Sequence, residues 1–565
     1  MPKEIGTGIQ NYEKIIKSNC FYIDKTNFIK EWWESCDEVT LITRPRRFGK
    51  TLNMSMLECF FSLNYADRGD LFEGLSIWQE EKYRQLQGTY PVINLSFSTI
   101  KEVDVETTRY QICEVIKNQY EKYSFLQQSG ILSEAELEFF KKMTFEIKRE
   151  DMPLSLNRLS EFLHRYYGKK VIILFDEYDT PMQEAYVNGY WDELVVLTRS
   201  LFNATFKSNP HMERSIMTGI TRVSKESVFS DLNNLKVVTT TSNDYATSFG
   251  FTQEEVFGAL DEFGLSGEKE CVKRWYDGFR FGNHSDIYNP WSIISFLDTH
   301  GEYKTYWANT SSNALVGKLI RQGSKKVKTT FEALLRDEVI HCPIDEQIVY
   351  NQLDTRESAI WSLLIASGYL KVLGMEKEEE MTSGGHPVYD LSLTNYEVKK
   401  MFMIMFVEWF EGRDGNYGEF IDAFLNNDIE AMNEYINEIT MESFSYFDTG
   451  TGSARSNTER FYHGFVLGLL TTLRDRYRLT SNLESGLGRY DVMLEPKNMK
   501  DNAYILEFKV HNPKKEDSME ATVENALKQI VEKQYEAALV SRGFDNDKIR
   551  KYGFAFEGKN VLIGE

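Results

Sequence analysis

Residues 41–51, LITRPRRFGKT, join an apolar stretch directly to Gly49, Lys50 and Thr51. A phosphate-binding loop needs backbone N–H groups turned toward the phosphates, a lysine that reaches their oxygens, and a hydroxyl for magnesium. Gly49, Lys50 and Thr51 supply the second half of such a loop. The segment therefore predicts a strand, a nucleotide-binding turn and a helix, with ATP and Mg²⁺ as ligands.

The first half of this loop departs from the usual pattern, because Arg44 stands where the first glycine is expected. An arginine can make that turn only if its φ is negative or the loop follows another path. Two arginines in the loop could bind phosphates in cis, act on the nucleotide of a neighbouring subunit in a homo-oligomer, or make surface ion pairs. The predicted nucleotide-binding residues of this segment are Arg46, Arg47, Phe48, Gly49, Lys50 and Thr51.

Four short apolar runs in the first half of the chain are typical of strands buried on both faces. They lie at 39–43, 90–97, 170–175 and 214–221, with helical stretches between them. This alternation favours an α/β fold with a largely parallel sheet. We expect residues 1–250 to form a P-loop ATPase domain.

Polar residues follow two of these runs. In VIILFDEYD, Asp176 could hold magnesium, and Glu177 could orient and deprotonate an attacking water. The next run ends in TGITR, which would place Thr218, Thr221 and Arg222 near the γ-phosphate if the sheet has the usual strand order of a P-loop ATPase. These hydroxyls could also be ordinary strand-end groups.

After residue 250 the sequence pattern changes to predicted helices separated by turns. FTQEEVFGAL opens on a threonine cap and YNPWSIISFL on an Asn-Pro start, so both predict helices. ESAIWSLLIASGYLKVLG and PVYDLSLTN predict a helix followed by a β-hairpin, an arrangement typical of winged helices. We expect a helical and winged-helix lid over 251–395 and a helical connector over 396–449. The small polar run at 450–457 favours a boundary before a last domain, 450–565.

Two alternating strands in the tail, GRYDVMLEP and AYILEFKV, are separated by a turn-rich heptad centred on Met499. A symmetric hairpin places Asp491 opposite Glu507, with Cβ atoms about 5 Å apart. Lys509 then lies on the same face. Two carboxylates form an oxygen site for Mg²⁺ or Mn²⁺, and the lysine can activate water or offset charge on a phosphate. Glu459, at the start of a predicted helix, could join the metal ligands.

The overall composition is that of a folded protein with several domains. The chain has 565 residues and a net charge of −21, but residues 450–565 hold 18 Lys and Arg against 17 Asp and Glu. Phosphate neutralisation supplies much of the affinity for nucleic acid, so the tail is the expected nucleic-acid surface. Six scattered cysteines favour neither a zinc site nor a disulfide framework. No long apolar stretch or leader is evident, so we expect no membrane contact and a cytoplasmic location.

These motifs together resemble known families. RPRRFGKT, FYIDKT, LFDEYDTP, TGITR and WYDGFRFG with YNPWSI resemble the AAA-ATPase-like family of bacterial proteins over roughly residues 1–300. The resemblance implies that an arginine-rich phosphate-binding loop without its first glycine is normal in that family. The tail resembles the PD-(D/E)XK nuclease superfamily, which implies a restriction-endonuclease-like α/β domain. By that resemblance Glu459, Asp491, Glu507 and Lys509 would be catalytic, supported by Gln529 and Tyr535.

The leading functional hypothesis is a metal-dependent nuclease that cleaves DNA under the control of ATP binding or hydrolysis. One alternative is an ATP-dependent switch or scaffold whose tail binds nucleic acid or protein without cleaving it. Another is a small-molecule kinase, which a winged-helix lid and a nuclease tail fit poorly. The intact acidic pair with its lysine favours the enzyme over the scaffold.

Overall fold

The computed structural model divides into two compact units: unit 1 comprises Met1–Leu319 and Val339–Val398, and unit 2 comprises Ile320–Glu338 and Lys399–Glu565. The residues that the structure describes are 3–221, 229, 232–307, 314–322, 325–335, 337–344, 353, 356–375, 387–411, 416–443, 466, 470, 473, 476–481, 484–485, 488–513, 515–557 and 560–565. Within this described part, no helix combines the length and apolar character that crossing a membrane requires.

Unit 1 is built on a five-stranded parallel sheet of order β2-β3-β4-β1-β5. The strands are β1 (Val39–Thr43), β2 (Val92–Ser96), β3 (Val171–Asp176), β4 (Met212–Gly219) and β5 (Leu235–Val238). The first four are those that the sequence predicts, and β5 is an additional edge strand. All residues of β1 and β3 are buried, as expected for strands covered on both faces.

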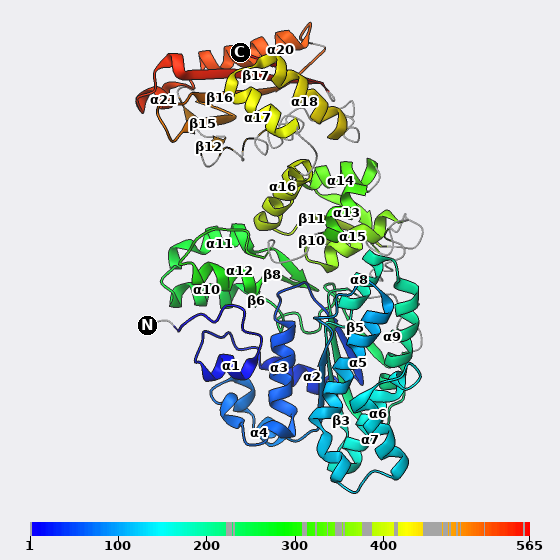
Figure 1. Ribbon diagram of the computed structural model, residues 1–565. Coiled ribbons are helices and arrows are strands. Elements are labelled where there is room, and N and C mark those ends of the chain that lie inside the picture. Colours follow the sequence, from blue (N-terminus) through cyan, green and yellow to red (C-terminus); the bar gives the residue numbers. More distant parts are fainter. Residues whose placement is uncertain are drawn as a thin grey trace. The chain divides into compact units, whose positions relative to one another are not determined.

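Helices cover both faces of this sheet (Figure 1). Alternate residues of β1, β2 and β3 share one apolar core with α5, α7 and α9, while α3 packs on the opposite face. The helices of this region are α1 (Tyr12–Lys17), α2 (Asn27–Glu34), α3 (Lys50–Phe61), α4 (Glu81–Leu86), α5 (Val105–Lys122), α6 (Glu134–Phe145), α7 (Ser155–Tyr167), α8 (Thr180–Asn188) and α9 (Trp191–Phe206). The predicted α/β class with a parallel sheet is confirmed.

The rest of unit 1 contains two small antiparallel sheets. One has the order β6-β8-β7, with β6 (Phe251–Thr252), β7 (Phe279–Phe281) and β8 (His284–Tyr288), and it is accompanied by α10 (Gln253–Glu262), α11 (Lys269–Tyr276) and α12 (Pro290–Asp298). Thr252 caps α10 in a capping box with Glu255, and Asn289 caps α12 ahead of Pro290, so both predicted helix starts are observed.

The predicted helix and hairpin form α15 (Glu357–Ala366), β10 (Leu370–Met375) and β11 (Val388–Leu393), with β9 (Ile340–Pro343) as a third strand beside β11. The charged hairpin tip at 376–386 lies outside the described residues. The division between the units crosses α13 (Ala314–Gln322), whereas α14 (Lys325–Leu335) and α16 (Tyr396–Glu411) from Lys399 onward belong to unit 2. The winged-helix assignment stays a prediction.

Unit 2 contains a mixed sheet of order β12-β15-β16-β17-β18. Its strands are β12 (Tyr477–Ser481), β15 (Val492–Pro496), β16 (Ala503–Val510), β17 (Ile549–Glu557) and β18 (Asn560–Gly564), and β13 (Glu484–Ser485) with β14 (Gly488–Arg489) form a separate pair. β16 and β17 are parallel, whereas the other neighbours in the five-stranded sheet are antiparallel.

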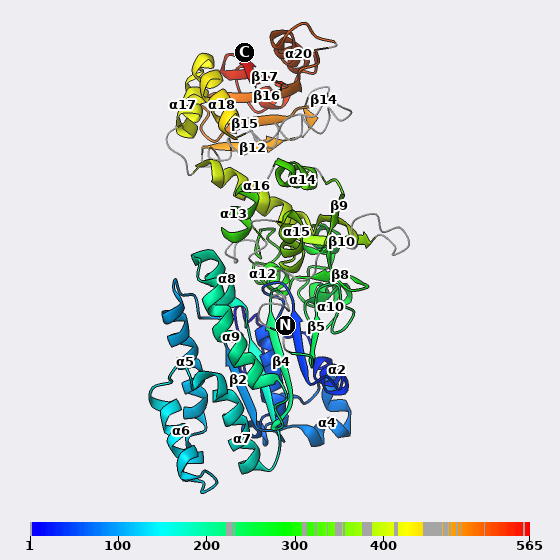
Figure 2. The same cartoon turned by 90° about the vertical axis from the view of Figure 1, so that its right-hand side faces the viewer.

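Helices cover both faces of this sheet as well (Figure 2). α17 (Asn416–Asn426) and α18 (Ile429–Ser443) share a core with Tyr504, Leu506 and Phe508. The other face packs on α20 (Met519–Glu532) and α21 (Ala537–Ser541) through Ile505 and its neighbours. Packing therefore joins the second half of the expected connector, 396–449, to the sheet of the expected last domain, 450–565.

Candidate nucleotide and nuclease sites

The predicted phosphate-binding loop runs from the end of β1 to the start of α3. Gly49 precedes the first residue of α3 with a φ of 82°, and Arg47 also takes the left-handed region, with a φ of 65°. Arg44 is not among the described residues with positive φ. The loop therefore follows an altered path, in which the left-handed turns come at Arg47 and Gly49 and none is needed at Arg44.

Arg44 is fully buried beneath this loop. Its Nη1 donates to the carbonyls of Thr43 and Thr239 at 3.0 and 2.6 Å, and its Nη2 donates to the carbonyl of Asp244 at 3.1 Å. The guanidinium also lies 4.5 Å from the ring centre of Phe281. Burial lowers the pKa of Arg44 to about 9. The side chain that replaces a glycine thus anchors the loop to the segment after β5.

Lys50 is 5% exposed and its Nζ donates to the carbonyls of Arg44 and Pro45, at 2.9 and 2.8 Å. Burial lowers the pKa of Lys50, and the nearby carboxylates of Glu177 and Asp176 oppose that shift. The amine therefore lies where the loop, the N-terminus of α3 and the acidic strand end meet. This is the position from which a lysine can reach bound phosphates.

Asp176 ends β3 and joins two hydroxyls. Its Oδ2 accepts from Thr51 Oγ1 at 2.7 Å, and its Oδ1 accepts from Thr218 Oγ1. Burial raises the pKa of Asp176, while the two hydroxyl donors lower it. Because β4 lies between β1 and β3, the sheet order brings Thr218 beside the carboxylate. Thr51 and Asp176, both predicted as metal ligands, are thus in direct contact.

Glu177 has a φ of 50°, an uncommon conformation for a residue with a side chain. Such backbone strain costs about 1 kcal/mol and occurs preferentially at functional sites. The side chain accepts from Thr180 Oγ1 at 3.2 Å and lines the same cavity as Lys50 and Thr51. Glu177 therefore faces the space where the sequence predicts an attacking water.

Thr221, predicted to lie near a γ-phosphate, is hydrogen-bonded to a buried carboxylate. Its backbone N and its Oγ1 donate to Asp179 Oδ2 at 2.9 and 2.8 Å, and Asp179 is 1% exposed. Gly219 is needed here, because a Cβ would come within 2.7 Å of Asp179 Oδ1 and of the Tyr178 ring. Asp179 was missed by the sequence analysis, and the second aspartate of DEYD was its only signal. Arg222 lies outside the described residues.

The cavity beside the loop has a volume of about 400 Å³. Its walls come from the loop, the N-terminal residues 6–25, and the region after residue 248. Lys25, which the sequence analysis missed, lines it and pairs with Glu255 at 2.6 Å. The cavity thus offers the Lys50 amine and the backbone N–H groups of the loop to phosphates, and the Thr51 hydroxyl beside Asp176 to a magnesium ion. These groups together fit a magnesium nucleotide.

The two loop arginines also lie at this cavity. Arg47 stacks on Trp291 at 4.4 Å, and Arg46 Nη2 donates to Gln183 Oε1 at 3.1 Å. The carbonyl of Arg46 accepts from Trp307 Nε1 at 3.0 Å, so side chains after residue 250 hold the loop backbone. Phe48 is 1% exposed and its ring packs on Phe279 and Phe281, so any contact with nucleotide would come from its backbone.

In unit 2, β15 and β16 pair in the register that the sequence predicts. Val492 pairs with Leu506, which sets Asp491 opposite Glu507. Asp491 Oδ2 accepts from the backbone N of Phe508 at 2.9 Å. Because Ile505 packs toward α20 and side chains alternate along β16, Glu507 and Lys509 belong to the α20 face.

Glu507 is the centre of this cluster. It is 2% exposed, and its Oε1 accepts from Lys509 Nζ at 3.0 Å and from Gln529 Nε2. Gln529 also lies 3.1 Å from the Tyr535 hydroxyl. The expected helix through both residues is shorter than predicted: α20 ends at Glu532, and Tyr535 follows a turn in which Gln534 has a φ of 51°.

The third predicted acidic ligand, Glu459, lies outside the described residues. Within the described part, no group of three His, Cys, Asp or Glu side chains is arranged to hold a metal ion. Among the described residues, Asp491 and Glu507 bring two carboxylates together here, next to the Lys509 amine and the Gln529 amide. This donor set fits a hard divalent cation that keeps several waters.

Two domain families match these two regions. Residues 6–229 match the family described as predicted AAA-ATPase, and residues 457–565 match the PD-(D/E)XK nuclease superfamily. The chain therefore carries a AAA-ATPase-like domain and a PD-(D/E)XK superfamily domain. The AAA-ATPase-like match spans the loop of Lys50 and the Asp176 strand end, and the PD-(D/E)XK match spans Asp491 to Gln529.

One curated protein aligns with this chain over nearly its whole length. The uncharacterized protein in the vnfD 5′ region of Azotobacter chroococcum mcd 1 is 22% identical over 98% of this chain and 99% of its own length. Among solved structures, the Aeropyrum pernix ORC2 protein in ADPNP and ADP complexes aligns with a TM-score of 0.23 and 9% identity, covering 72% of this chain and 96% of that chain.

Proposed function

We propose that this protein binds and hydrolyses ATP in unit 1 and cleaves DNA in unit 2, with the nucleotide controlling cleavage. The proposal includes the four domain ranges expected from the sequence, 1–250, 251–395, 396–449 and 450–565, and a cytoplasmic location. The observation that carries the nuclease half is the Asp491–Glu507 pair on one face of a hairpin, with Lys509 bonded to Glu507.

The ATPase half is supported by the contact between Thr51 and Asp176 beside Lys50. A bound magnesium ion would neutralise charge on the β- and γ-phosphates during transfer. Thr51 and Asp176 would hold it, Lys50 would bind the phosphate oxygens, and Glu177 would orient water and accept its proton. The left-handed backbone at Glu177 positions that carboxylate at the cavity instead of along the strand.

In the nuclease half, Asp491 and Glu507 would hold a divalent cation, Mg²⁺ or Mn²⁺, which supplies an activated water and stabilises charge on the scissile phosphate. Lys509 would donate to that phosphate or orient the water. Gln529 and Tyr535 keep Glu507 in place from the α20 side. Glu459 is proposed as a further ligand on the family resemblance.

The test is cleavage of plasmid, linear and single-stranded DNA, and of RNA, in Mg²⁺ or Mn²⁺, with and without ATP. We expect cleavage of DNA by the wild-type protein and a loss of about 10²-fold or more in Asp491→Asn. Asp501→Asn is the matched control, because Asp501 lies in the same hairpin turn and bonds Arg476 at the surface. Equal cleavage by the Asp491 and Asp501 variants would contradict the assignment.

A second candidate is an ATP-dependent switch whose tail binds nucleic acid or protein without cutting it. It is favoured by the occupation of Glu507 Oε1 by both Lys509 and Gln529. If the wild-type protein cleaves none of the substrates in either metal, with and without ATP, yet retards DNA on a gel, the switch replaces the nuclease.

A further inference from the structure

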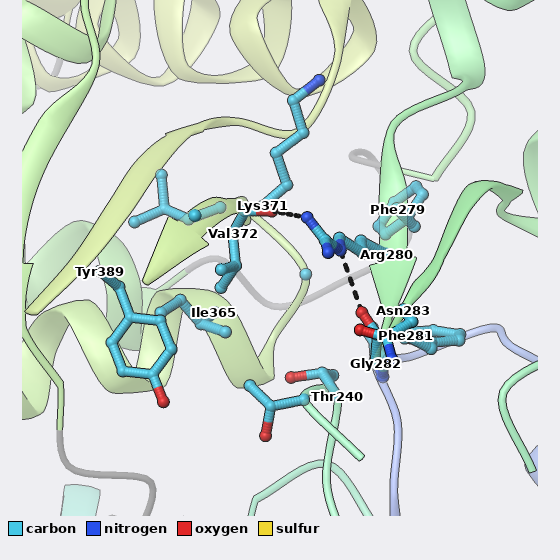
Figure 3. A pocket seen from close by; sticks show the side chains of 15 residues that line it. Thr240, Phe279, Arg280, Phe281, Gly282, Asn283, Ile365, Lys371, Val372 and Tyr389 are labelled. Carbon is cyan, nitrogen blue, oxygen red and sulfur yellow. Dashed lines mark hydrogen bonds between the residues drawn. The ribbon is translucent and has the colours of Figure 1, made fainter. Parts of the chain in front are cut away.

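Unit 1 has a second cavity, of about 320 Å³, which β7 lines together with Pro45 of the phosphate-binding loop. Its walls are β7, β10, the start of β11 and the segment at Thr240 (Figure 3). It shares no lining residue with the cavity beside Lys50. Neither the nucleotide site nor the Asp491 cluster uses it.

A cationic side chain of β7 lies at this cavity. Phe279 and Phe281 pack on Phe48, with ring centres 4.8 and 5.4 Å from its ring, and Arg280 between them lines the cavity. Figure 3 shows its guanidinium reaching across the cavity toward Val372, with Ile365 and Tyr389 beyond.

Among the described residues, the hydrogen-bond acceptors of Arg280 are backbone carbonyl oxygens. Its Nε donates to Gly282 O at 3.0 Å, and its Nη1 lies 3.3 Å from the carbonyls of Val372 and Leu373. Among the described residues, no carboxylate lies within ion-pair distance of this guanidinium. A guanidinium in a recess that has no carboxylate partner in the described part of the chain favours an anionic ligand, because an uncompensated charge is costly where water is partly excluded.

The remaining walls are mixed. Ile365 and Val372 are aliphatic, Tyr389 and Phe281 are aromatic, and Thr240 adds a hydroxyl group. Such a lining suits a flat apolar body, while the few polar groups fix its orientation. We propose that this cavity is a second ligand site, which takes a small organic anion whose carboxylate or phosphate binds Arg280 and whose ring lies against Ile365 and Val372.

The position of the cavity also implies what its ligand does. β7 contacts both places: Arg280 lines the second cavity, and Phe279 and Phe281 pack on Phe48 of the phosphate-binding loop, which lines the first. Pro45 of the same loop lines the second cavity. An anion that fixes β7 against β10 reduces the ordering that nucleotide binding still has to supply, so the two ligands bind with positive cooperativity. This coupling rests on the proposed ATP site, whereas anion binding does not.

The binding test uses benzoate, with benzamide as the neutral probe of the same shape and acetate as the anion without a ring. For benzoate we expect a dissociation constant on the order of 1 mM. At 10 mM and without nucleotide, benzoate should slow hydrogen exchange at least twofold in residues 279–283 and 370–374, and benzamide and acetate should not. Phenylphosphate, tested in Lys50→Ala so that the nucleotide site is disabled, distinguishes a phosphate from a carboxylate ligand.

Two variants make the test specific. Arg280→Gln should abolish the benzoate effect. Lys371→Gln should keep the benzoate effect. This substitution also removes a nearby positive charge, but the Lys371 side chain points away from the cavity in Figure 3. Val372→Phe, which fills the space and keeps Arg280, should also abolish binding, and unfolding midpoints show whether each variant is folded.

Equal protection by benzamide and benzoate, undiminished protection in Arg280→Gln, or no protection in the wild type would each overturn the site. The coupling is measured separately, as ATP affinity with and without 10 mM benzoate, and we expect it to tighten about twofold or more. Protection at β7 without any ATP binding would leave the anion site standing and refute the proposed ATPase half.

Discussion

Arg44 shows how a phosphate-binding turn forms without a glycine at its start. The two left-handed residues lie later in the loop, at Arg47 and Gly49, and the Arg44 guanidinium donates to three carbonyls below it. Hydrogen bonds of the Arg44 side chain therefore fix the start of the loop, whereas the Lys50 amine is fixed by hydrogen bonds to two carbonyls of the loop itself.

Two substitutions separate binding from hydrolysis at this loop. Lys50→Ala should weaken ATP binding at least tenfold, because it removes the amine that reaches the phosphates. Glu177→Gln should leave the affinity within about threefold and lower the rate of hydrolysis about 10²-fold or more, because it removes the proton acceptor. Nucleotide titration and phosphate release measure the two quantities. Glu184→Gln, on α8, is the matched control. Equal turnover in the Lys50 and Glu177 variants would refute these roles.

Asp277 predicts a pH dependence of stability in unit 1. Burial, and then the hydrogen bond with Asp286, raise its pKa to about 7, while Lys273 opposes the shift. Lys371 also faces this pair. The native protein therefore keeps a proton that the unfolded chain releases near pH 4, and the free energy of unfolding falls as pH rises from about 4 to 7. The amide of Asp277→Asn does not titrate in this range, so this contribution to the pH dependence should be absent in the variant.

We expect the stability of Asp277→Asn relative to wild type to increase by about 1–2 kcal/mol between pH 5 and pH 8, a figure reduced for partial solvent screening. An amide can still accept from Gly278 N, as Asp277 Oδ1 does at 2.6 Å, and can donate to Asp286. The measurement is urea unfolding at the two pH values, with hydrogen exchange of unit 1 residues as the readout. Glu262→Gln, an exposed change on α10, should show none. A pH-independent difference for Asp277→Asn would disprove the raised pKa.

At the scale of helices and strands, local patterns predicted most of the fold. β1 to β4 could be predicted because each is a short apolar run. α10 and α12 could be predicted because Thr252 and Asn289 are typical N-cap residues. The Asp491–Glu507 pairing was found because a hairpin register follows from the centre of its turn. β5 was missed, because three of its four residues are only half-buried and its pattern is weak.

Contacts between distant segments could not be predicted in this way. Lys25 reaches the nucleotide cavity only because residues 6–25 fold over the loop, and Trp291 reaches Arg47 from the start of α12. The strand-end position of Thr221 left two alternatives, a residue near the γ-phosphate or an ordinary strand-end hydroxyl. Its hydroxyl donates to the buried carboxylate of Asp179, which lies two residues beyond the expected pair of Asp176 and Glu177.

Two glycines give opposite predictions at this scale. Gly219→Ala should destabilise the protein by about 1–3 kcal/mol, because the new Cβ meets Asp179 and Tyr178 at 2.7 Å. Gly258→Ala, inside α10 with open space around it, should stabilise by about 0.5–1 kcal/mol. Thermal unfolding midpoints measure both. If Gly219→Ala unfolds like wild type, the strand end must rearrange more easily than its packing indicates.

At the scale of the whole molecule, the proposal requires that the state of the nucleotide site changes the activity of unit 2. Lys50→Ala should retain the cleavage rate that wild type shows without ATP, and ATP should no longer alter that rate. The comparison is plasmid cleavage with and without ATP in wild type, Lys50→Ala and the cavity-wall control Lys101→Ala. A response to ATP that persists in Lys50→Ala would place the control elsewhere.

The packing of α17 and α18 on the C-terminal sheet bears on how such modules pass between proteins. The nuclease-superfamily match begins at residue 457, but Phe424 and Ile436 upstream of it are fully buried against Tyr504 and its neighbours. A fragment cut at the match would expose one apolar face of the sheet to water and aggregate. A fragment of unit 2 that keeps this apolar face covered therefore has to begin no later than Asn416, the first residue of α17.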